Sequence, residues 1–489
     1  MMRRVGLPAI HVNGIRMISS FDVHPTMVDS FGKQSPVTIT TPRDTAVTVL
    51  SNGTRVITHD FDGPNTAIGL YVPAGAKNDP STFPGMNYAL RWCFLSSNID
   101  NSQFQVDKSF RSVGASYEHS ELQKKLLSFK LEASRETWKE PFSHMLSCMI
   151  VPRFAQTEIL KVQDAMENAT EEHRWKSPRE WCIEQVEQVA FKGEPLGNPR
   201  HITPYFVDEL TSARMQEQWC RTFKPDGVTI TGVNVDHNDL VMHCEAHPFS
   251  HDASAPHFKQ SIENTETREH EMYQGGNELE FQEKREKEMS TKPFLENETI
   301  GALTWKSHGT SSLPEYASAL VLRQILAISL REGLKVHGGP VNYGIESFYV
   351  PFAKVGLMGV TFREKTGDAL DAIKSSLKIQ SELNDQIVVK SIVESAKSRA
   401  KLRLFHDHIE LRRDYIDFLT LFHANEPKKD AYKSIISAID AVKVSDLKQS
   451  VAYANSTSPC MYTMGDVYGI PSLRQLGFNR DKSKSQIEA

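Results

Sequence analysis

The chain has 489 residues, more than a single hydrophobic core ordinarily serves, so its length predicts two domains of roughly 200 to 230 residues each. Its 56 basic and 61 acidic side chains leave a net charge of −5, and this balance argues against a nucleic-acid-binding protein. The longest apolar candidate, 319–330, is interrupted by Arg323 and Gln324, so no membrane span is expected.

The first twenty or so residues, at the start of an N-terminal segment placed at 1–44, differ from the rest in composition. Arg3, Arg4 and Arg16 are the only charged residues before Asp22, and serines follow closely. A basic, acid-free N-terminus of this kind is typical of a mitochondrial transit peptide. We therefore expect a transit-like segment and extension here, with a frayed basic terminus as the alternative.

The first half reads as strands interspersed with long helical patterns. Residues 47–50 and 55–58 flank Asn52-Gly53, which predicts a β-hairpin. Further strands are expected at 67–71, 112–117, 126–133 and 227–235, and helices at 85–96, 136–150, 155–175 and 177–191. The strands are too polar to be buried on both faces. We therefore predict an α+β fold with a mixed, mostly antiparallel sheet and helices packed on one side.

The second half repeats the first at an offset of about 231 residues. The paired features are the strand at 67–71 with that at 299–303, the helix after Pro84 with that after Pro314, the strands around Phe129 and Val360, the helices opening at Glu136 and Asp368, and the strands ending at Gly232 and Gly465. Two copies at so long a period predict two tandem homologous domains rather than a solenoid.

Composition sets the expected domain limits. The two copies are placed at 45–249 and 299–478. The stretch between them, 250–298, is rich in charge and poor in apolar periodicity, which predicts a linker. Residues 479–489 form a polar tail.

Four segments in order carry a family resemblance: Leu50–Ile57, Ala67–Trp92, Tyr273–Glu278 and Gly465–Pro471. Together they resemble the pitrilysin-type zinc peptidases, the inverzincins, over residues 45 to 478. Within that family the chain is similar to the mitochondrial processing peptidase subunits and the related core proteins of respiratory complex III.

The resemblance implies an H-x-x-E-H motif on the first-domain helix, where two imidazoles bind zinc and the glutamate activates the metal-bound water. Aligning that helix on Gly85 and Leu90 places Tyr88, Arg91 and Trp92 at the motif positions. Tyrosine is a poor zinc ligand, indole cannot coordinate zinc, and a guanidinium repels a dication. We therefore expect a degenerate site with no catalytic residue, no metal and no cofactor.

The remaining family positions do not supply a zinc site either. The third zinc ligand, a glutamate in active members, falls on Ala169, beside Thr170. A shifted alignment would supply a carboxylate from Glu167, Glu171 or Glu172, but one carboxylate without its imidazoles would not hold zinc. The equivalent helix of the second copy, after Pro314, contains no histidine, as the family's second domain usually does not.

Two other kinds of candidate site occur in the sequence, clusters of histidines and a loop with consecutive glycines. In His243-Cys-Glu-Ala-His247-Pro-Phe-Ser-His251 the histidines recur every four residues, but Pro248 ends the helix, so a solvated helix end is favoured over a zinc site. His406 and His408 lie in a charged helix and are read in the same way.

The candidate glycine loop contains Gly338, Gly339 and Pro340. It matches one corner of the glycine-rich loop with which processing peptidase alpha subunits draw in presequences. The preceding residues, 329–335, are predicted to be helical, where the family loop has consecutive glycines. A plain helix-to-strand turn is therefore favoured over a surviving presequence loop.

The resemblance leaves three functions open. The first is a non-catalytic core subunit of complex III on the matrix side of the mitochondrial inner membrane, peripheral to the bilayer, with a homologous core protein 1 and the cytochrome b and cytochrome c1 subunits as partners. The second is a non-catalytic processing peptidase alpha subunit, which binds presequences for a zinc-bearing beta subunit. A free peptidase of bacterial type is the third, and Tyr88, Arg91 and Trp92 argue against it.

Overall fold

The computed structural model describes residues 11–12, 15–16, 45–150, 152–247, 272–274, 276–281, 298–336, 344–423, 431–467 and 469–478. Residues 43–489 form one compact unit, and residues 1–42 form another. Within the predicted transit-like segment, β1 (His11–Val12) pairs with β2 (Ile15–Arg16). That this segment is a transit peptide stays a prediction.

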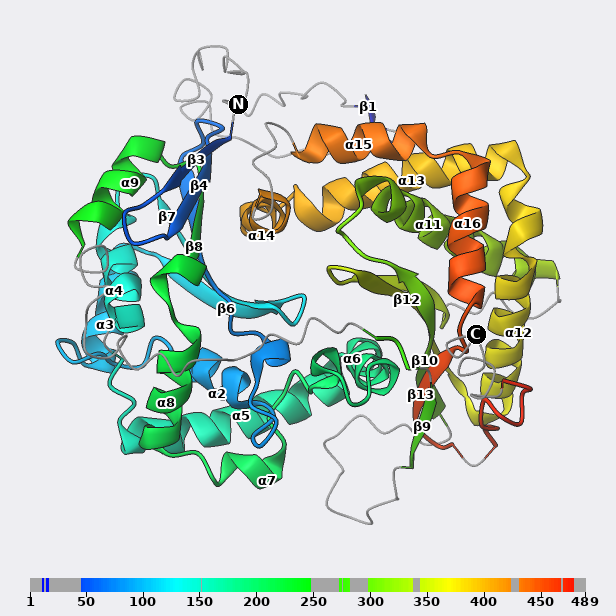
Figure 1. Ribbon diagram of the computed structural model, residues 1–489, viewed down its shortest axis with the longest axis horizontal. Helices are drawn as coiled ribbons and strands as arrows, with labels where there is room; N and C mark the ends of the chain where they lie inside the picture. The colour runs from blue at the N-terminus through cyan, green and yellow to red at the C-terminus, as the bar shows by residue number, and fades with distance from the viewer. Residues whose placement is uncertain are drawn as a thin grey trace, which may run out of the picture. The chain divides into compact units, whose positions relative to one another are not determined.

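The first half builds a six-stranded sheet in the order β3-β4-β8-β5-β7-β6 (Figure 1). Its strands are β3 (Ala46–Val49), β4 (Arg55–His59), β5 (Asn65–Val72), β6 (Ser116–Leu122), β7 (Leu126–Ser134) and β8 (Thr229–Val233). The pairings are antiparallel except for β4 with β8. The hairpin predicted around Asn52-Gly53 is confirmed as β3 and β4.

The helices predicted in this half are confirmed as α2 (Met86–Cys93), α4 (Lys139–Ile150), α5 (Gln156–Lys176) and α6 (Pro178–Ala190). Others are α3 (Gln103–Ser112), α7 (Pro204–Val207), α8 (Ser212–Thr222) and α9 (His237–Ala246), with single turns η1 (Ala76–Asn78), η2 (Pro195–Gly197) and η3 (Pro225–Gly227). The strand predicted at 112–117 was placed too early, because the capping box of Ser102 and Gln105 starts α3 and the helix runs to Ser112.

The second half builds a five-stranded sheet in the order β11-β12-β10-β13-β9. Its strands are β9 (Gly276–Phe281), β10 (Glu298–His308), β11 (Glu346–Pro351), β12 (Val355–Lys365) and β13 (Cys460–Gly465). Its helices are α11 (Leu313–Val336), α12 (Thr366–Ile387), α13 (Lys390–His408), α14 (Arg412–His423), α15 (Ala431–Ala441) and α16 (Val444–Asn455). Strand β9 lies within the predicted linker, so that charged stretch also supplies an edge strand to the sheet. The predicted domain limits stay a prediction.

The internal repeat appears in the sheets as a repeated topology. The order β4-β8-β5-β7-β6 matches β9-β13-β10-β12-β11, and in each case only the first pairing is parallel. Ile68 pairs with Leu131 and Gly232. The residues 232 positions later (300 − 68) pair in the same way, Ile300 with Arg363 and with Met464. The repeat therefore preserves strand register as well as element order.

Each central strand is buried on both faces, contrary to the expectation from strand polarity. Along β5, Ile68 and Leu70 pack in the core of the first half, whereas Ala67 and Tyr71 pack in the core cluster of the second half. Successive side chains of a strand point to opposite faces, so the second set faces a different layer. Polar side chains of the first sheet find hydrogen-bond partners in that second layer: Tyr71 of β5 donates to Asp417, and Thr231 of β8 bonds to Thr420.

The second layer on each sheet comes from the other half of the chain. Helix α14 packs against β5 and β8 of the first sheet, and α6 packs against β10 and β13 of the second (Figure 1). Cys182 and Val186 of α6 share a cluster with Ile300 and Ala302 of β10. The prediction of helices on one side therefore fails for α6 and α14, which each pack on the sheet of the other half. One helix from the other half packs on the opposite face.

Helix α11 is the one described helix that is long and apolar enough to cross a membrane by length and composition, over Leu313–Arg331. Of that window 61% is buried inside the protein. The helix packs against α12, α13, α15 and α16 as well as β11. These contacts are those of the core helix of the second half.

Candidate functional site

Helix α2, which carries the predicted zinc-motif positions, begins at a tightly constrained turn. Gly85, before the first helical residue, has φ 90°, and a Cβ there would lie 2.5 Å from Cα of Ile202. The Asp79 carboxylate accepts hydrogen bonds from the backbone N–H groups of Gly85 and Asn87, both 2.8 Å. Burial raises the pKa of Asp79 well above its usual range, although these two hydrogen bonds oppose the shift.

The side chains at the predicted zinc-motif positions are two aromatic rings and a guanidinium, which pack against one another and against neighbouring residues. Tyr88 is 5% exposed, and the Arg91 guanidinium carbon lies 4.7 Å from the centre of its ring. The Trp92 ring packs edge-on against His119 of β6, with 5.0 Å between ring centres. Burial, with help from Arg91, lowers the pKa of His119 to about 4, so this imidazole is neutral at physiological pH.

The position expected for the third zinc ligand lies opposite this group. The Tyr88 hydroxyl is 3.5 Å from Oγ1 of Thr170 on α5, the residue next to Ala169. The Thr170 hydroxyl donates to the backbone carbonyl of Met166, 2.9 Å away. A zinc ion does not fit among these side chains, because a phenol, a hydroxyl and an indole are not the imidazoles and carboxylate that zinc binds, and a guanidinium lies among them. That they stand at the family's ligand positions stays a prediction.

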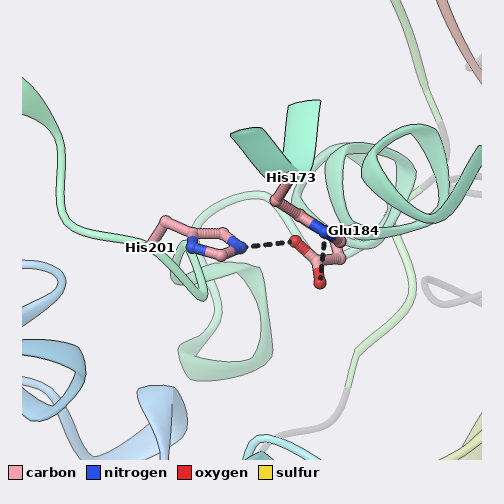
Figure 2. Close-up of side chains that lie close together, drawn as sticks. All are labelled: His173, Glu184 and His201. Carbon is pink, nitrogen blue, oxygen red and sulfur yellow. Dashed lines mark hydrogen bonds and ion pairs between the residues drawn. The ribbon is translucent and has the colours of Figure 1, made fainter. Parts of the chain in front are cut away.

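Next to Tyr88, the structure brings together three side chains that sequence reasoning did not single out: His173, Glu184 and His201 (Figure 2). Nε2 of His173 lies 3.3 Å from Oε1 of Glu184, and Nε2 of His201 lies 3.0 Å from Oε2 of the same carboxylate. The His201 ring also packs against Tyr88, with 5.0 Å between ring centres. The cluster therefore adjoins the predicted zinc-motif positions.

Glu184 and His173 influence each other's protonation. Burial alone would raise the pKa of Glu184, but hydrogen bonds from His173 and His201 outweigh it and hold that pKa well below its usual range. The hydrogen bond to Glu184 raises the pKa of His173. The carboxylate is therefore ionised throughout the physiological range.

A buried charge network holds the loop that carries His201. Arg200 pairs with Glu187 of α6 at 3.0 Å and with Glu121 of β6 at 3.2 Å. Lys124, whose side chain is fully buried, lies 3.3 Å from Glu187 and donates to the backbone carbonyls of Leu196 and, at 2.9 Å, of Asn198. Two cations and two anions thus balance one another beside η2.

The competing sites predicted from sequence do not assemble a metal site in the described residues. Helix α9 ends at Ala246, before Pro248 as predicted. His243 and His247 are half-buried rather than solvated, because they hydrogen-bond to Ser143 at 2.9 Å and Ser147 at 3.2 Å of α4. His251 lies outside the described residues.

Gly338, Gly339 and Pro340, the predicted remnant of a presequence loop, also lie outside the described residues. The helix predicted before them is confirmed, since α11 continues without a break through residues 329–335 to Val336. The place of the family's glycine run is therefore helical in this chain.

The fold is that of an α+β protein. Residues 55–203 match the insulinase family, peptidase family M16, so this region is similar to a peptidase M16 domain. The match covers β4 through the loop of His201, the part that holds both the motif helix and the cluster of Figure 2.

Similarity to individual proteins extends beyond that domain. The chain is 22% identical to the mitochondrial-processing peptidase subunit alpha-2 of Dictyostelium discoideum over 88% of this chain and 93% of that protein. It is 23% identical to the ubiquinol-cytochrome-c reductase complex core protein 2 of Euglena gracilis over 80% of each chain. It is 22% identical to cytochrome b-c1 complex subunit 2 of Rattus norvegicus over 41% of this chain and 43% of that one.

One sequence signal would have pointed to the cluster. His173 stands four residues after Ala169, so it lies one helical turn along the same face of α5 as the family's third ligand position. Glu184 and His201 carry no comparable signal, because only the α5–α6 turn and the loop after η2 bring them to His173.

Proposed function

We propose that this protein is a non-catalytic, core protein 2-like subunit of mitochondrial complex III, needed for assembly and stability of the complex on the matrix side of the inner membrane. Its partners in this proposal are a homologous core protein 1 and the cytochrome b and cytochrome c1 subunits. The relatives with core protein 2 and subunit 2 names support this assignment.

The proposal that the protein has no peptidase activity is supported by the packing of the side chains of α2. Tyr88, Arg91 and Trp92 occupy the positions where active family members bind zinc and activate water, and their side chains are packed against Thr170, His119 and one another. Peptide hydrolysis by the family mechanism needs a metal-bound water at this point. These residues supply neither the ligands nor a general base.

A second candidate function is the alpha subunit of the mitochondrial processing peptidase, which would bind presequences for a zinc-bearing beta subunit. The Dictyostelium relative supports it. The unbroken course of α11 to Val336 favours the complex III role instead, because a continuous helix lacks the backbone freedom of a glycine-rich loop. The basic segment at 1–44 suits mitochondrial import under both proposals.

The proteins that co-purify with this chain distinguish the two candidate functions. The tagged full-length protein would be purified from mitochondria in mild detergent and its partners identified by mass spectrometry. Co-purification with cytochromes b and c1 is expected. Recovery solely as a soluble pair with an H-x-x-E-H protein would overturn the complex III role and support the alternative.

Peptidase activity tests the non-catalytic part by itself. The purified chain should leave a presequence peptide uncut, with or without added Zn²⁺, and a processing peptidase pair with an intact H-x-x-E-H motif serves as the positive control. Specific cleavage by the chain alone, abolished by a chelator, would refute the degenerate-site reading.

A further inference from the structure

The cluster of His173, Glu184 and His201 has the composition of a transition-metal site. Within the described residues it is the one group of three or more such side chains whose ligand atoms all lie close together, within 4.8 Å of one another. Two imidazole nitrogens and a carboxylate form a ligand set that zinc binds in proteins. The set shares no residue with the zinc-motif positions on α2.

The three ligand groups lie close to the spacing of a four-coordinate centre. Zinc bonds of about 2.0–2.2 Å to nitrogen and oxygen place neighbouring tetrahedral ligands about 3.3–3.5 Å apart. Oε1 of Glu184 lies 3.3 Å from Nε2 of His173, Oε2 lies 3.0 Å from Nε2 of His201, and one ligand atom from each of the three residues lies within 4.8 Å of the others. Rotation about side-chain bonds supplies the movement that would bring all three onto one ion.

Each ligand is positioned by contacts outside the cluster. The short α5–α6 connection, with Pro178 at the first position of α6, brings His173 over Glu184. Arg200 anchors the loop of His201 through its buried ion pairs, and Ile202 packs on Gly85. Such support from outside the ligand set is what keeps a metal site in place.

The three side chains are partly buried but remain accessible to solvent. The side chains of His173, Glu184 and His201 are 23%, 20% and 16% exposed. The Trp181 ring packs against both imidazoles, with ring centres 6.1 and 5.7 Å apart. Because all three side chains are partly exposed, an ion can reach them from solvent.

We infer that His173, Glu184 and His201 form a binding site for one zinc ion, which cross-links α5, α6 and the loop after η2. The ion joins three segments, and one of them, α6, is the helix that the first half contributes to the second sheet. The site therefore stabilises the connection between the halves. It is independent of the proposed function, because it needs no partner and no peptide.

Zinc titration of the full-length, chelator-stripped protein tests this inference. One Zn²⁺ per chain should bind with a Kd below about 1 μM, and saturating Zn²⁺ should raise the thermal midpoint by about 2–5 °C. His201→Gln, which keeps a polar side chain of similar length beside Glu184, should weaken binding at least about 100-fold and abolish the thermal shift. Absence of stoichiometric binding at 100 μM Zn²⁺ would overturn the site.

Matched control variants test whether other histidines bind the zinc ion. His406 forms an exposed pair with Glu410 and has no third ligand, so His406→Gln should leave the affinity unchanged. His243→Gln, in the pair bonded to α4, should also leave it unchanged. If either control removes the zinc while His201→Gln retains it, the ion lies elsewhere and the inference fails.

X-ray absorption of the zinc-loaded wild-type protein needs no variant and so remains informative if His201→Gln does not fold. A coordination shell of nitrogen and oxygen with two imidazoles is expected. A sulfur shell, from any of the six cysteines, would contradict the assignment. Failure of this test leaves the partner experiment for the proposed function unaffected.

Discussion

At the scale of single residues, the predicted zinc-motif positions depend on the identity of a few side chains and on one glycine. Alignment on Gly85 put Tyr88 at one of these positions and Ala169, beside Thr170, at the third ligand position, and the structure places the Tyr88 hydroxyl 3.5 Å from Oγ1 of Thr170. Gly85 makes that alignment possible, because its positive φ and its contact with Ile202 determine where α2 starts.

Replacing Gly85 with alanine should therefore destabilise the protein. The new Cβ would be 2.5 Å from the Ile202 backbone at a φ of 90°, so strain and overlap add to a loss of about 2–4 kcal/mol in the free energy of unfolding. Gly193→Ala is the control, since Gly193 has φ 87° and open space around the added Cβ. Its cost should be about 1–2 kcal/mol. Equal costs in denaturant unfolding would show that the contact with Ile202 does not matter.

At the scale of elements, the loop between α6 and α7 takes its conformation from charges rather than from regular structure. Arg200 and Lys124 reach Glu187 of α6, and Arg200 also reaches Glu121 of β6. Since a buried ion without its partner is costly, these contacts select one arrangement of loop, helix and strand.

Glu187→Gln should cost about 3–5 kcal/mol of stability, because it leaves Lys124 and Arg200 short of one buried negative charge. Glu217→Gln breaks the exposed pair with Arg221 and should change stability by less than about 1 kcal/mol. Urea denaturation of both variants measures the contrast. A Glu187→Gln protein as stable as the control would mean that water compensates the network.

At the scale of the whole compact unit, the two sheets depend on each other's helices. Asp417 of α14 accepts a hydrogen bond from Tyr71 of β5 at 2.7 Å and pairs with Lys130 of β7 at 2.5 Å. Burial raises the pKa of Asp417, while Lys130 opposes that shift. The second half therefore completes the polar contacts of the first sheet.

Asp417→Asn should lower the free energy of unfolding by about 2–4 kcal/mol, since Lys130, 4% exposed, loses its counter-ion. In a double-mutant cycle with Tyr71→Phe the two effects should be non-additive by about 0.5–3 kcal/mol. Glu118→Gln breaks the exposed pair with Arg413 of α14 and serves as the control. Additive effects of the first two changes would contradict a shared contact between the halves.

The sequence by itself predicted most strands, most helices and the repeat, because periodicity and turn residues are local properties. The loss of zinc chemistry on α2 stays a prediction from residue identity. It misjudged strand burial, because the layer that covers each sheet's second face comes from the other half. Only the tertiary structure brought His173, Glu184 and His201 together. Their meeting depends on the α5–α6 turn and on a loop held by Arg200, interactions between segments that no local pattern encodes.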